Sequence, residues 1–245
     1  MAPCYDRHAT QQKHTLETLV DGVLPYTKTG AWVLDAGCGT GYLQSCLAAR
    51  GLAWRVYGVD VSAAMCAIAR SLMPAVACAD LTSLPIADAS MDMVFSSSAM
   101  QWVGSLDAAY EEANRVLALE GVIAIAVYVD GTLRELHEAM KQAGWPVWRF
   151  AHEQDHLQAL EVAGFKIDQV NIEDSKQLGS SLHDLLRSLK NIGANRYYPA
   201  TQPTMKLQLF RQIERYYDQH FRQDGASYAS WRIAYLIARK KAGLS

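Results

Sequence analysis

A glycine-rich loop carries the strongest chemical signal in the chain. Residues 33–41 read Val-Leu-Asp-Ala-Gly-Cys-Gly-Thr-Gly, so an acidic residue ends a short apolar run and three glycines follow at alternate positions. Glycine has no Cβ and can adopt positive φ, which lets a ligand lie against the backbone. A dinucleotide-binding loop would need glycine at position 42, where the chain has Tyr42. The Asp35 carboxylate would repel a pyrophosphate but attract an ammonium or a sulfonium, so the loop predicts a cationic cofactor.

Two further carboxylates follow later apolar runs, in the order that a bound adenosyl group requires. Asp60 ends the run 55–60, where its oxygens can accept hydrogen bonds from both hydroxyls of a ribose. Asp80 follows the run 75–79, where a side-chain oxygen can accept a hydrogen bond from the adenine amino group. Read alone, either acid could be a helix N-cap or a turn residue. As an ordered set behind the glycine loop, they predict S-adenosylmethionine as the cofactor.

The glycines and acids must stand at one edge of a sheet, because the carboxyl ends of parallel strands meet there. Short apolar runs alternate with apolar stripes at helical spacing, which predicts a doubly wound, mostly parallel, seven-stranded α/β sheet with helices on both faces. The predicted strands are 32–35, 55–60, 75–79, 91–96, 122–128, 165–172 and 231–238. The predicted helices are 16–24, 42–50, 63–72, 106–117, 133–143, 155–163, 182–192 and 205–221.

The chain is predicted to form one domain over residues 1–245, with a helical insertion at about 180–222 before the last strand. A chain of 245 residues that is 50% hydrophobic can bury one core and carry a small additional lobe. The insertion differs in charge from the rest. Between Lys176 and Arg222 the basic residues outnumber the acidic ones by five, whereas the whole chain has a net charge of −2. The remainder of the molecule is therefore acidic, at −7.

Composition excludes several classes of function. With a net charge of −2, the chain has no overall positive charge that would attract nucleic acid or an anionic membrane. The N-terminus lacks an apolar secretory segment and the longest apolar run has only the length of a strand, so we expect a cytoplasmic protein. Five cysteines without a C-x-x-C pair indicate reduced thiols rather than a disulfide framework or a zinc site. No metal is predicted, because His152 and His156 are four apart without an evident third ligand.

The glycine loop and the two later acids together resemble class I S-adenosylmethionine-dependent methyltransferases over about the first 130 residues. Four segments narrow the resemblance and extend it nearly end to end, namely 80–85, 96–102, 130–136 and 186–194. They look like the malonyl-acyl-carrier-protein O-methyltransferases of biotin synthesis. The Ala-x-Gln-Trp run that ends at Trp102 and the Arg-Ser-Leu-Lys-x-Ile-Gly helix end that starts at Arg187 are the more specific matches.

The resemblance implies transfer of a methyl group from S-adenosylmethionine to the free carboxylate of a malonyl thioester held on acyl carrier protein. It implies that the catalytic residues are Tyr5, Gln101 and Trp102, although Trp102 would equally suit the core. Acyl carrier proteins are acidic, so Arg187 and Lys190 are the predicted carrier-binding residues. The predicted cofactor-binding residues are Asp35, Gly37, Gly39, Gly41, Asp60, Val61, Asp80, Leu81 and, where the family usually has asparagine, Ser97.

Two alternatives to this function stay open at the level of the sequence. Family members carry a further N-terminal segment before the tyrosine that Tyr5 resembles, so we expect an incomplete lid over the site. A shortened N-terminus would suit a module that binds S-adenosylmethionine and regulates without catalysis. The chain could also methylate another small carboxylic acid, which would need no basic docking surface.

Overall fold

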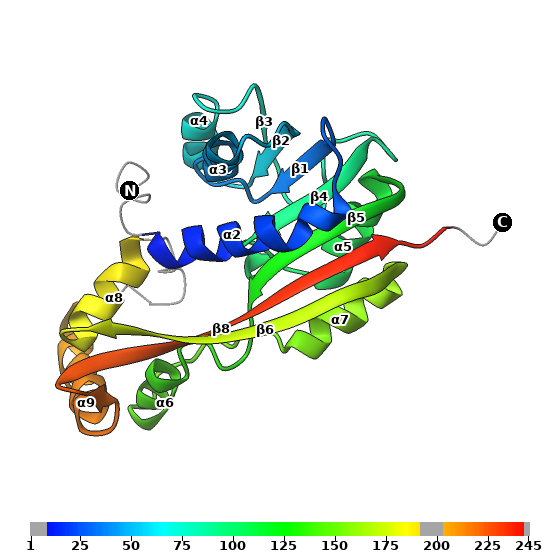
Figure 1. Cartoon of the computed structure of the whole chain (residues 1–245). Helices are drawn as coiled ribbons and strands as arrows, with labels where there is room; N and C mark the ends of the chain where they lie inside the picture. The colour runs from blue at the N-terminus through cyan, green and yellow to red at the C-terminus, as the bar shows by residue number, and fades with distance from the viewer. Residues whose placement is uncertain (1–8, 192–202, 243–245) are drawn as a thin grey trace.

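The computed structural model describes residues 9–191 and 203–242, and one mixed sheet forms its centre (Figure 1). The strands are β1 (Trp32–Ala36), β2 (Arg55–Asp60), β3 (Ala75–Cys78), β4 (Met91–Ser97), β5 (Leu117–Tyr128), β6 (Phe165–Gly179), β7 (Arg222–Gln223) and β8 (Ala226–Lys240). They lie in the order β3-β2-β1-β4-β5-β8-β6, and the two-residue β7 pairs with β8. The first five strands are parallel, whereas β8 runs antiparallel to β5 and β6. The predicted α/β fold class is confirmed.

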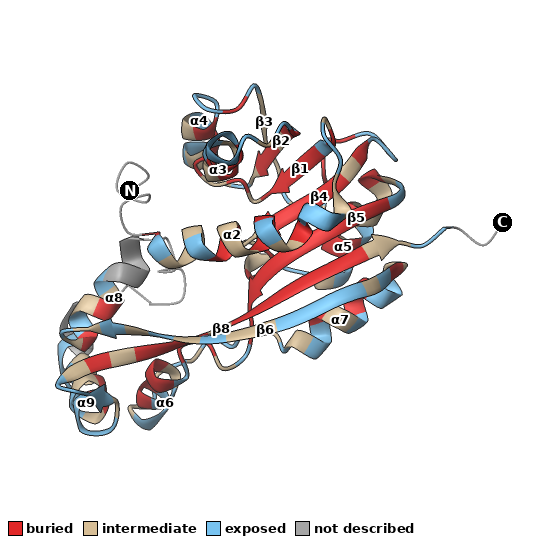
Figure 2. Cartoon of the chain, in the orientation of Figure 1, coloured by how far each residue is buried: buried red, intermediate tan, exposed pale blue. Residues whose placement is uncertain are grey.

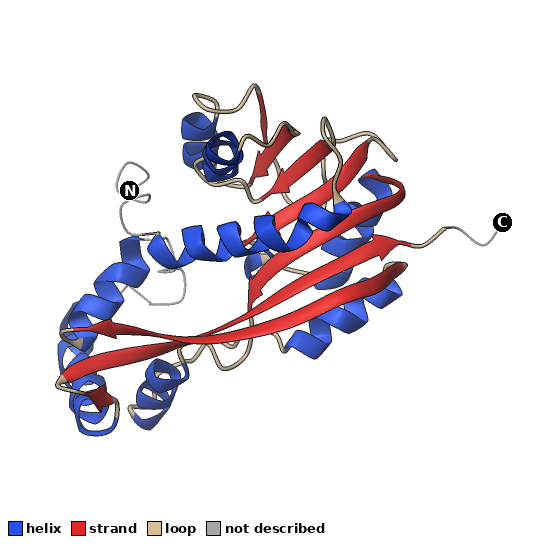
Figure 3. Ribbon diagram, viewed as in Figure 1, coloured by secondary structure: helices blue, strands red, loops and turns tan. Residues whose placement is uncertain are grey.

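Helices cover both faces of this sheet (Figure 3). The helices are α2 (Thr10–Val23), η1 (Leu24–Tyr26), α3 (Tyr42–Arg50), α4 (Ala63–Ala69), η2 (Met100–Trp102), α5 (Leu106–Val116), α6 (Arg134–Gln142), α7 (Glu153–Val162), α8 (Leu182–Asn191) and α9 (Pro203–His220). Successive residues of a strand point to opposite faces, so Val33 joins the core under α2 and α3 while Leu34 joins the core under α5 and α7. Serine side chains cap α4 and α5, where Ser62 and Ser105 accept hydrogen bonds from backbone N–H groups.

The central strands are buried on both faces, which explains why they read as continuous apolar runs (Figure 2). Every residue of 122–129 is buried, because helices lie above and below β5. Among the described residues, no helix is both long and apolar enough to cross a membrane.

The outer halves of β6 and β8 form a two-stranded ribbon that extends beyond the main sheet. β8 pairs with β5 only through residues 233–239, whereas its ladder with β6 continues to Gly179 and Ser227. Both strands have 15 residues and are much longer than the predicted 165–172 and 231–238. We call this ribbon, together with α6, α8 and α9, the distal lobe. It contains the helical insertion that the sequence predicts before the last strand.

Apolar packing and one buried carboxylate hold the distal lobe together. The side chains at its centre are Leu182, Leu185, Ile213, Tyr217, Ala229 and Trp231. Glu135 is only 2% exposed, and its carboxylate accepts hydrogen bonds from the Ser230 N–H group (2.9 Å) and the Ser230 hydroxyl (2.5 Å). Because the buried acid is fully hydrogen-bonded, it ties α6 to the ribbon instead of destabilising it.

Candidate active site

Three glycines in the loop between β1 and α3 have backbone conformations that residues with a Cβ rarely adopt. Gly37, Gly39 and Gly41 all have positive φ, at +85°, +53° and +88°. A Cβ on Gly37 would lie 2.2 Å from the Cβ of Ala99. The N–H groups of Gly37 and Cys38 donate to the carbonyl oxygen of Val59 at 2.7 and 2.9 Å. The loop is therefore fixed against the end of β2, with its backbone open to a ligand.

Asp60 connects the end of β2 to this loop. Its Oδ2 accepts a hydrogen bond from the Gly39 N–H group (2.9 Å), and its Oδ1 accepts one from the Ser62 N–H group (2.8 Å). The next residue, Val61, is 70% exposed, which is unusual for a large apolar side chain. A half-buried carboxylate held by two backbone amides beside an exposed apolar side chain is suited to a ligand with both hydroxyls and a flat ring.

Asp35 is the least satisfied charged group of the site. It is 3% exposed, and its Oδ2 has no hydrogen-bond partner within the described part of the chain. Burial, and secondarily the nearby Asp60, raise the pKa of Asp35 to about 8. An unpartnered buried carboxylate carries a free-energy cost that a bound cation would remove.

A pocket lies between the glycine loop, the end of β4 and the first turns of α2. Its lining residues are Ala9, Gln12, Lys13, Leu16, Asp35, Gly37, Cys38, Gly39, Thr40, Tyr42, Ser97 and Ser98. The Tyr42 hydroxyl donates to Glu17 Oε1 (2.5 Å), and Lys13 Nζ lies 4.7 Å from the centre of the Tyr42 ring. These contacts hold α2 against the start of α3, so α2 forms the wall opposite the loop (Figure 1).

A polar and aromatic wall follows β4. Gln101 is 7% exposed, its Nε2 donates to the Ser98 carbonyl oxygen (2.8 Å), and its Oε1 has no partner among the described residues. The Trp102 ring lies 6.1 Å from the Phe150 ring, which in turn lies 6.2 Å from His137. Burial lowers the pKa of His137 below its usual range. Trp102 packs against the core, and its contact with the substrate stays a prediction.

Three further predicted site residues, Asp80, Leu81 and Ser97, lie at or just after the ends of β3 and β4. Asp80 and Leu81 follow β3, next to the end of β2, so they share an edge with Asp60. Asp80 Oδ1 accepts hydrogen bonds from the backbone (2.9 Å) and the hydroxyl (2.8 Å) of Thr82, which lower the pKa of Asp80. The Ser97 hydroxyl is buried without a partner among the described residues.

The residues predicted to contact the substrate or its carrier are separate from that edge. Arg187 is exposed on α8 in the distal lobe, where its guanidinium lies 3.4 Å from His183 Nε2. The structure does not bring Arg187 into the pocket beside the glycine loop. The side chain of Lys190 and the whole of Tyr5 lie outside the described residues.

Lys13, Tyr42 and Ser98 are among the pocket residues that the sequence does not predict. Lys13 lies on α2 before the predicted helix 16–24, and in the sequence Tyr42 indicates only a departure from a dinucleotide-binding loop. Ser98 has a φ of +58°, a conformation that serine adopts rarely and that clusters at functional sites. A possible signal in the sequence was the polar pair Gln12 and Lys13, which shares a helix face with Leu16.

Comparisons with known proteins identify this arrangement. A family model described as "Methyltransferase domain" matches residues 34–125. The malonyl-[acyl-carrier protein] O-methyltransferase of Laribacter hongkongensis is 33% identical over 96% of this chain and 84% of that protein. The protein of the same name from Geobacter sulfurreducens is 31% identical over 96% of this chain and 94% of its own length. The chain belongs to the malonyl-[acyl-carrier protein] O-methyltransferase family.

Solved structures share the fold of this methyltransferase. The YcgJ protein of Bacillus subtilis superposes with a TM-score of 0.65 at 15% identity, covering 94% of this chain and 99% of its own. Geranyl diphosphate C-methyltransferase of Streptomyces coelicolor, solved with S-adenosyl-L-homocysteine, has a TM-score of 0.55 at 16% identity, covering 92% and 79%. Its family makes the chain a methyltransferase with S-adenosylmethionine as its cofactor, and these structures show the shared fold.

The residues present fit that cofactor. S-adenosylmethionine supplies a methyl group on a positively charged sulfonium, and its methionyl part carries an ammonium group. The unpartnered carboxylate oxygen of Asp35 offers a buried negative charge to such a cation. Nothing lies within 4 Å of the place that a Cβ at Gly39 would occupy, so the backbone of the loop is open there.

Proposed function

We propose that this methyltransferase esterifies the free carboxylate of a malonyl thioester carried on acyl carrier protein, as a cytoplasmic step of biotin biosynthesis. The observation that carries the proposal is the identity of 31–33% with relatives of that name over 96% of the chain. Such coverage includes the distal lobe as well as the cofactor pocket. Because substrates are usually selected outside the cofactor motif, similarity across the lobe supports a shared substrate class.

The proposed cofactor contacts follow the edge formed by β1, β2, β3 and β4. Asp60 accepts hydrogen bonds from the ribose hydroxyls, and Asp80 accepts one from the adenine amino group. Val61 and Leu81 pack against the adenine ring, while Asp35 faces the cationic methionyl part. Gly37, Gly39 and Gly41 let the ligand approach the backbone, and Ser97 lies nearest to the methyl donor.

The proposed reaction needs positioning more than proton transfer. A malonyl carboxyl group is already ionised at neutral pH, because such groups titrate near pH 4. An oxygen of that carboxylate must approach the sulfonium methyl group in line, in a site closed to water, and such orientation can contribute roughly 7–11 kcal/mol. Trp102 shapes this approach. Gln101 presents a free Oε1, which as an acceptor suits the cationic cofactor rather than the anionic substrate.

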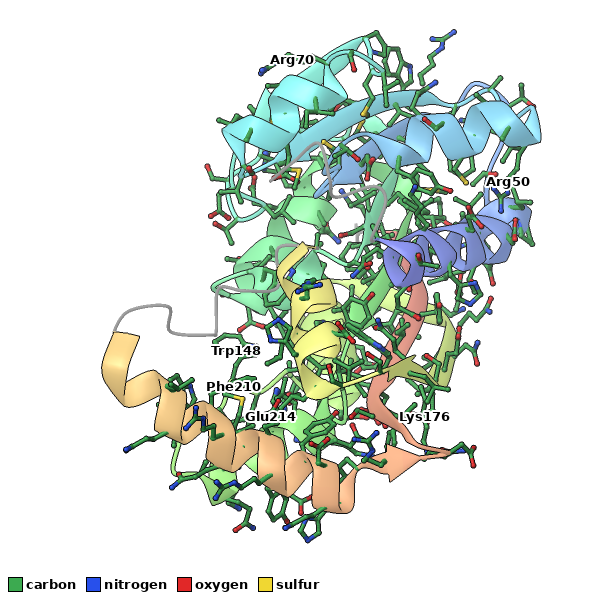
Figure 4. The ribbon with its side chains drawn as sticks, turned by 90° about the vertical axis from the view of Figure 1, so that its left-hand side faces the viewer. Arg50, Arg70, Trp148, Lys176, Phe210 and Glu214 are labelled. Carbon is green, nitrogen blue, oxygen red and sulfur yellow. The ribbon has the colours of Figure 1, made fainter. Side chains whose placement is uncertain are left out.

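The proposed carrier-docking surface is the basic side of the distal lobe. Arg187 on α8 is exposed, and so are Arg211 and Arg215 on α9. We include Lys190, one turn after Arg187, from the sequence alone. Positive charge on an otherwise acidic molecule would steer an acidic carrier toward this end. Trp148, which is exposed, and Phe210 both lie on the side of the molecule that faces the viewer in Figure 4.

One assay tests the proposal against its two alternatives. The purified chain is incubated with methyl-labelled S-adenosylmethionine and, in separate reactions, with malonyl-acyl carrier protein, malonyl-coenzyme A, succinyl-acyl carrier protein and free malonate. We expect label in a base-labile ester that forms fastest with malonyl-acyl carrier protein. Label that enters free malonate equally well would identify a small-acid methyltransferase. Cofactor binding without any methyl transfer would identify a regulatory module. An Asp60→Ala variant measures the background level of label.

A further inference from the structure

Two cysteines flank the backbone segment that follows β2. Cys66, on α4, is fully buried, whereas Cys78, the last residue of β3, is exposed. Cys66 Sγ lies 3.3 Å from the carbonyl oxygen of Asp60, and Cys78 Sγ lies 3.5 Å from the carbonyl oxygen of Val61. The two sulfurs therefore contact adjacent peptide groups of the segment that we assign to the ribose and adenine.

The two thiols also lie on neighbouring elements. Cys78 pairs with Asp60 in the parallel ladder of β2 and β3. Cys66 Sγ lies 3.4 Å from the carbonyl oxygen of Ala77, the residue before Cys78. Burial, Asp60 and the nearby Cys78 thiol raise the pKa of Cys66. A disulfide requires Cβ atoms about 3.5–4.5 Å apart. Because the two sulfurs contact adjacent peptide groups of one segment, we expect a small movement of α4 toward β3 to bring them into bonding distance.

Exposure distinguishes Cys78 from the other described cysteines. Cys38 and Cys46 are buried, and burial raises the pKa of both thiols. Burial also raises the pKa of Cys66. Cys78 is the one exposed cysteine among the described residues, so a dissolved oxidant meets its sulfur first.

We propose that Cys66 and Cys78 are a site of disulfide formation by peroxide, and that the disulfide weakens binding of S-adenosylmethionine. The Cys78 thiolate attacks one oxygen of hydrogen peroxide, the O–O bond breaks, and a sulfenic acid and water result. The Cys66 sulfur then attacks the Cys78 sulfur, loses its proton and displaces a second water. Two thiols and one peroxide become one disulfide and two waters, and the peroxide is the species reduced.

The disulfide would act on the cofactor through the peptide groups that the sulfurs contact. An S–S bond of about 2.05 Å is far shorter than any contact between two unbonded sulfurs. Drawing α4 and β3 together must displace the Asp60 and Val61 carbonyl groups that stand against them. Asp60 also holds the Gly39 N–H group, so the displacement reaches the glycine loop.

The experiment uses the full chain, treated with hydrogen peroxide that is then removed by catalase. We expect a mass loss of two hydrogens and a non-reducing peptide map that links Cys66 to Cys78. Calorimetry should show S-adenosylmethionine binding about tenfold more weakly, with full recovery after reduction. These readouts need no acyl substrate, so they stand apart from the proposed malonyl activity.

Matched variants make the outcome decisive. Cys78→Ser should retain its cofactor affinity after peroxide, and Cys66→Ala should do the same while leaving only an oxidised Cys78. Cys46→Ala, on α3, should lose affinity on oxidation just as the unaltered chain does. A peptide map that links Cys38 instead, oxidation of Cys78 without a cross-link, or a Cys66–Cys78 disulfide with unchanged cofactor affinity would each overturn the proposal.

Discussion

The cofactor pocket and the distal lobe are built by different physical means. The pocket consists of backbone groups and carboxylates at strand ends, with glycines at positions where a side chain cannot fit, such as Gly37. The lobe consists of helices packed by apolar side chains onto a two-stranded ribbon, and its basic residues Arg187, Arg211 and Arg215 are exposed. A pocket of the first kind tolerates almost no change, whereas a surface of the second kind can change one residue at a time. Substitutions should therefore separate cofactor binding from carrier binding.

The largest effect is expected from Gly37→Ala. The new methyl group would stand 2.2 Å from the Ala99 Cβ at a φ of +85°, so the loop must move away from β4. We expect the affinity for S-adenosylmethionine to fall by more than about 100-fold in calorimetry. Gly51→Ala is the matched control, because Gly51 has a φ of +66° with nothing within 4 Å. It should lose about 1 kcal/mol of stability and keep its cofactor affinity. Equal losses of affinity in both variants would refute the steric argument.

Asp60→Ala should cause the next largest loss of affinity for S-adenosylmethionine. Hydrogen bonds from ribose hydroxyls to a charged group are worth about 1.5–3 kcal/mol, which corresponds to roughly 10- to 150-fold in affinity. The apparent affinity for the carrier, measured at saturating cofactor, should stay unchanged. A folded variant with the original cofactor affinity would remove Asp60 from the site.

The pH dependence of cofactor binding should reveal Asp35. With a pKa raised to about 8, this carboxyl group is mostly protonated at pH 6 and must lose its proton to pair with a cation. Affinity should therefore rise about tenfold between pH 6 and pH 7 and level off above pH 8. The rate of methyl transfer in single turnover with saturating cofactor should stay nearly flat over the same range. Asp35→Asn should remove the slope in affinity, and a slope that persists would assign it to another group.

The same raised pKa affects folding with a definite sign. In the unfolded chain Asp35 ionises near pH 3.8, but in the free enzyme it stays protonated up to about pH 8. Its contribution to stability is therefore complete below pH 3.8 and is lost as the pH rises toward 8. Asp35→Asn should consequently be more stable than the unaltered chain at pH 8, and chemical denaturation at pH 5 and pH 8 measures this difference.

The smallest effect is expected from the distal lobe. Arg187→Glu should raise the KM for the carrier by a few fold at low salt, since exposed charges contribute about 0.2–1 kcal/mol each. The difference should disappear at high salt, and cofactor affinity should not change. Lys166→Glu makes the same change of charge on the opposite end of β6, where it should have no effect on KM. If both variants behave alike, the carrier docks elsewhere.

The strands and helices around the cofactor pocket could be predicted closely, because their sequence signals are local. β1 extends one residue beyond the predicted 32–35, and α3 and β2 have the predicted bounds, since buried parallel strands read as apolar runs between turns. The ribbon could not be predicted in the same way. Residues 173–177 of β6 read Glu-Asp-Ser-Lys-Gln, which has no apolar alternation, and only the ladder with β8 makes them a strand.

The candidate site could also be predicted only in part from the sequence. Asp35 and Asp60 could be predicted as site residues from their place after apolar runs. The hydrogen bond between Asp60 and Gly39 could not, because it joins residues 21 apart. The placement of α2 over the loop depends on contacts such as Tyr42 with Glu17, which no periodic pattern encodes. Helix α4 ends at Ala69 rather than Leu72, since Arg70 already caps it through the Cys66 and Ile68 carbonyls.

The position of β8 has a consequence for synthesis of the chain. Residues 226–240 leave the ribosome after β5 and β6, yet they lie between these two strands in the finished sheet. Until they emerge, β5 and β6 cannot be neighbours, and each presents an unpaired edge that can bind another nascent chain. Folding of this half of the sheet must therefore wait until residues 226–240 have been made. A chain that stops before residue 226 should aggregate even though its complete cofactor motif has already been made.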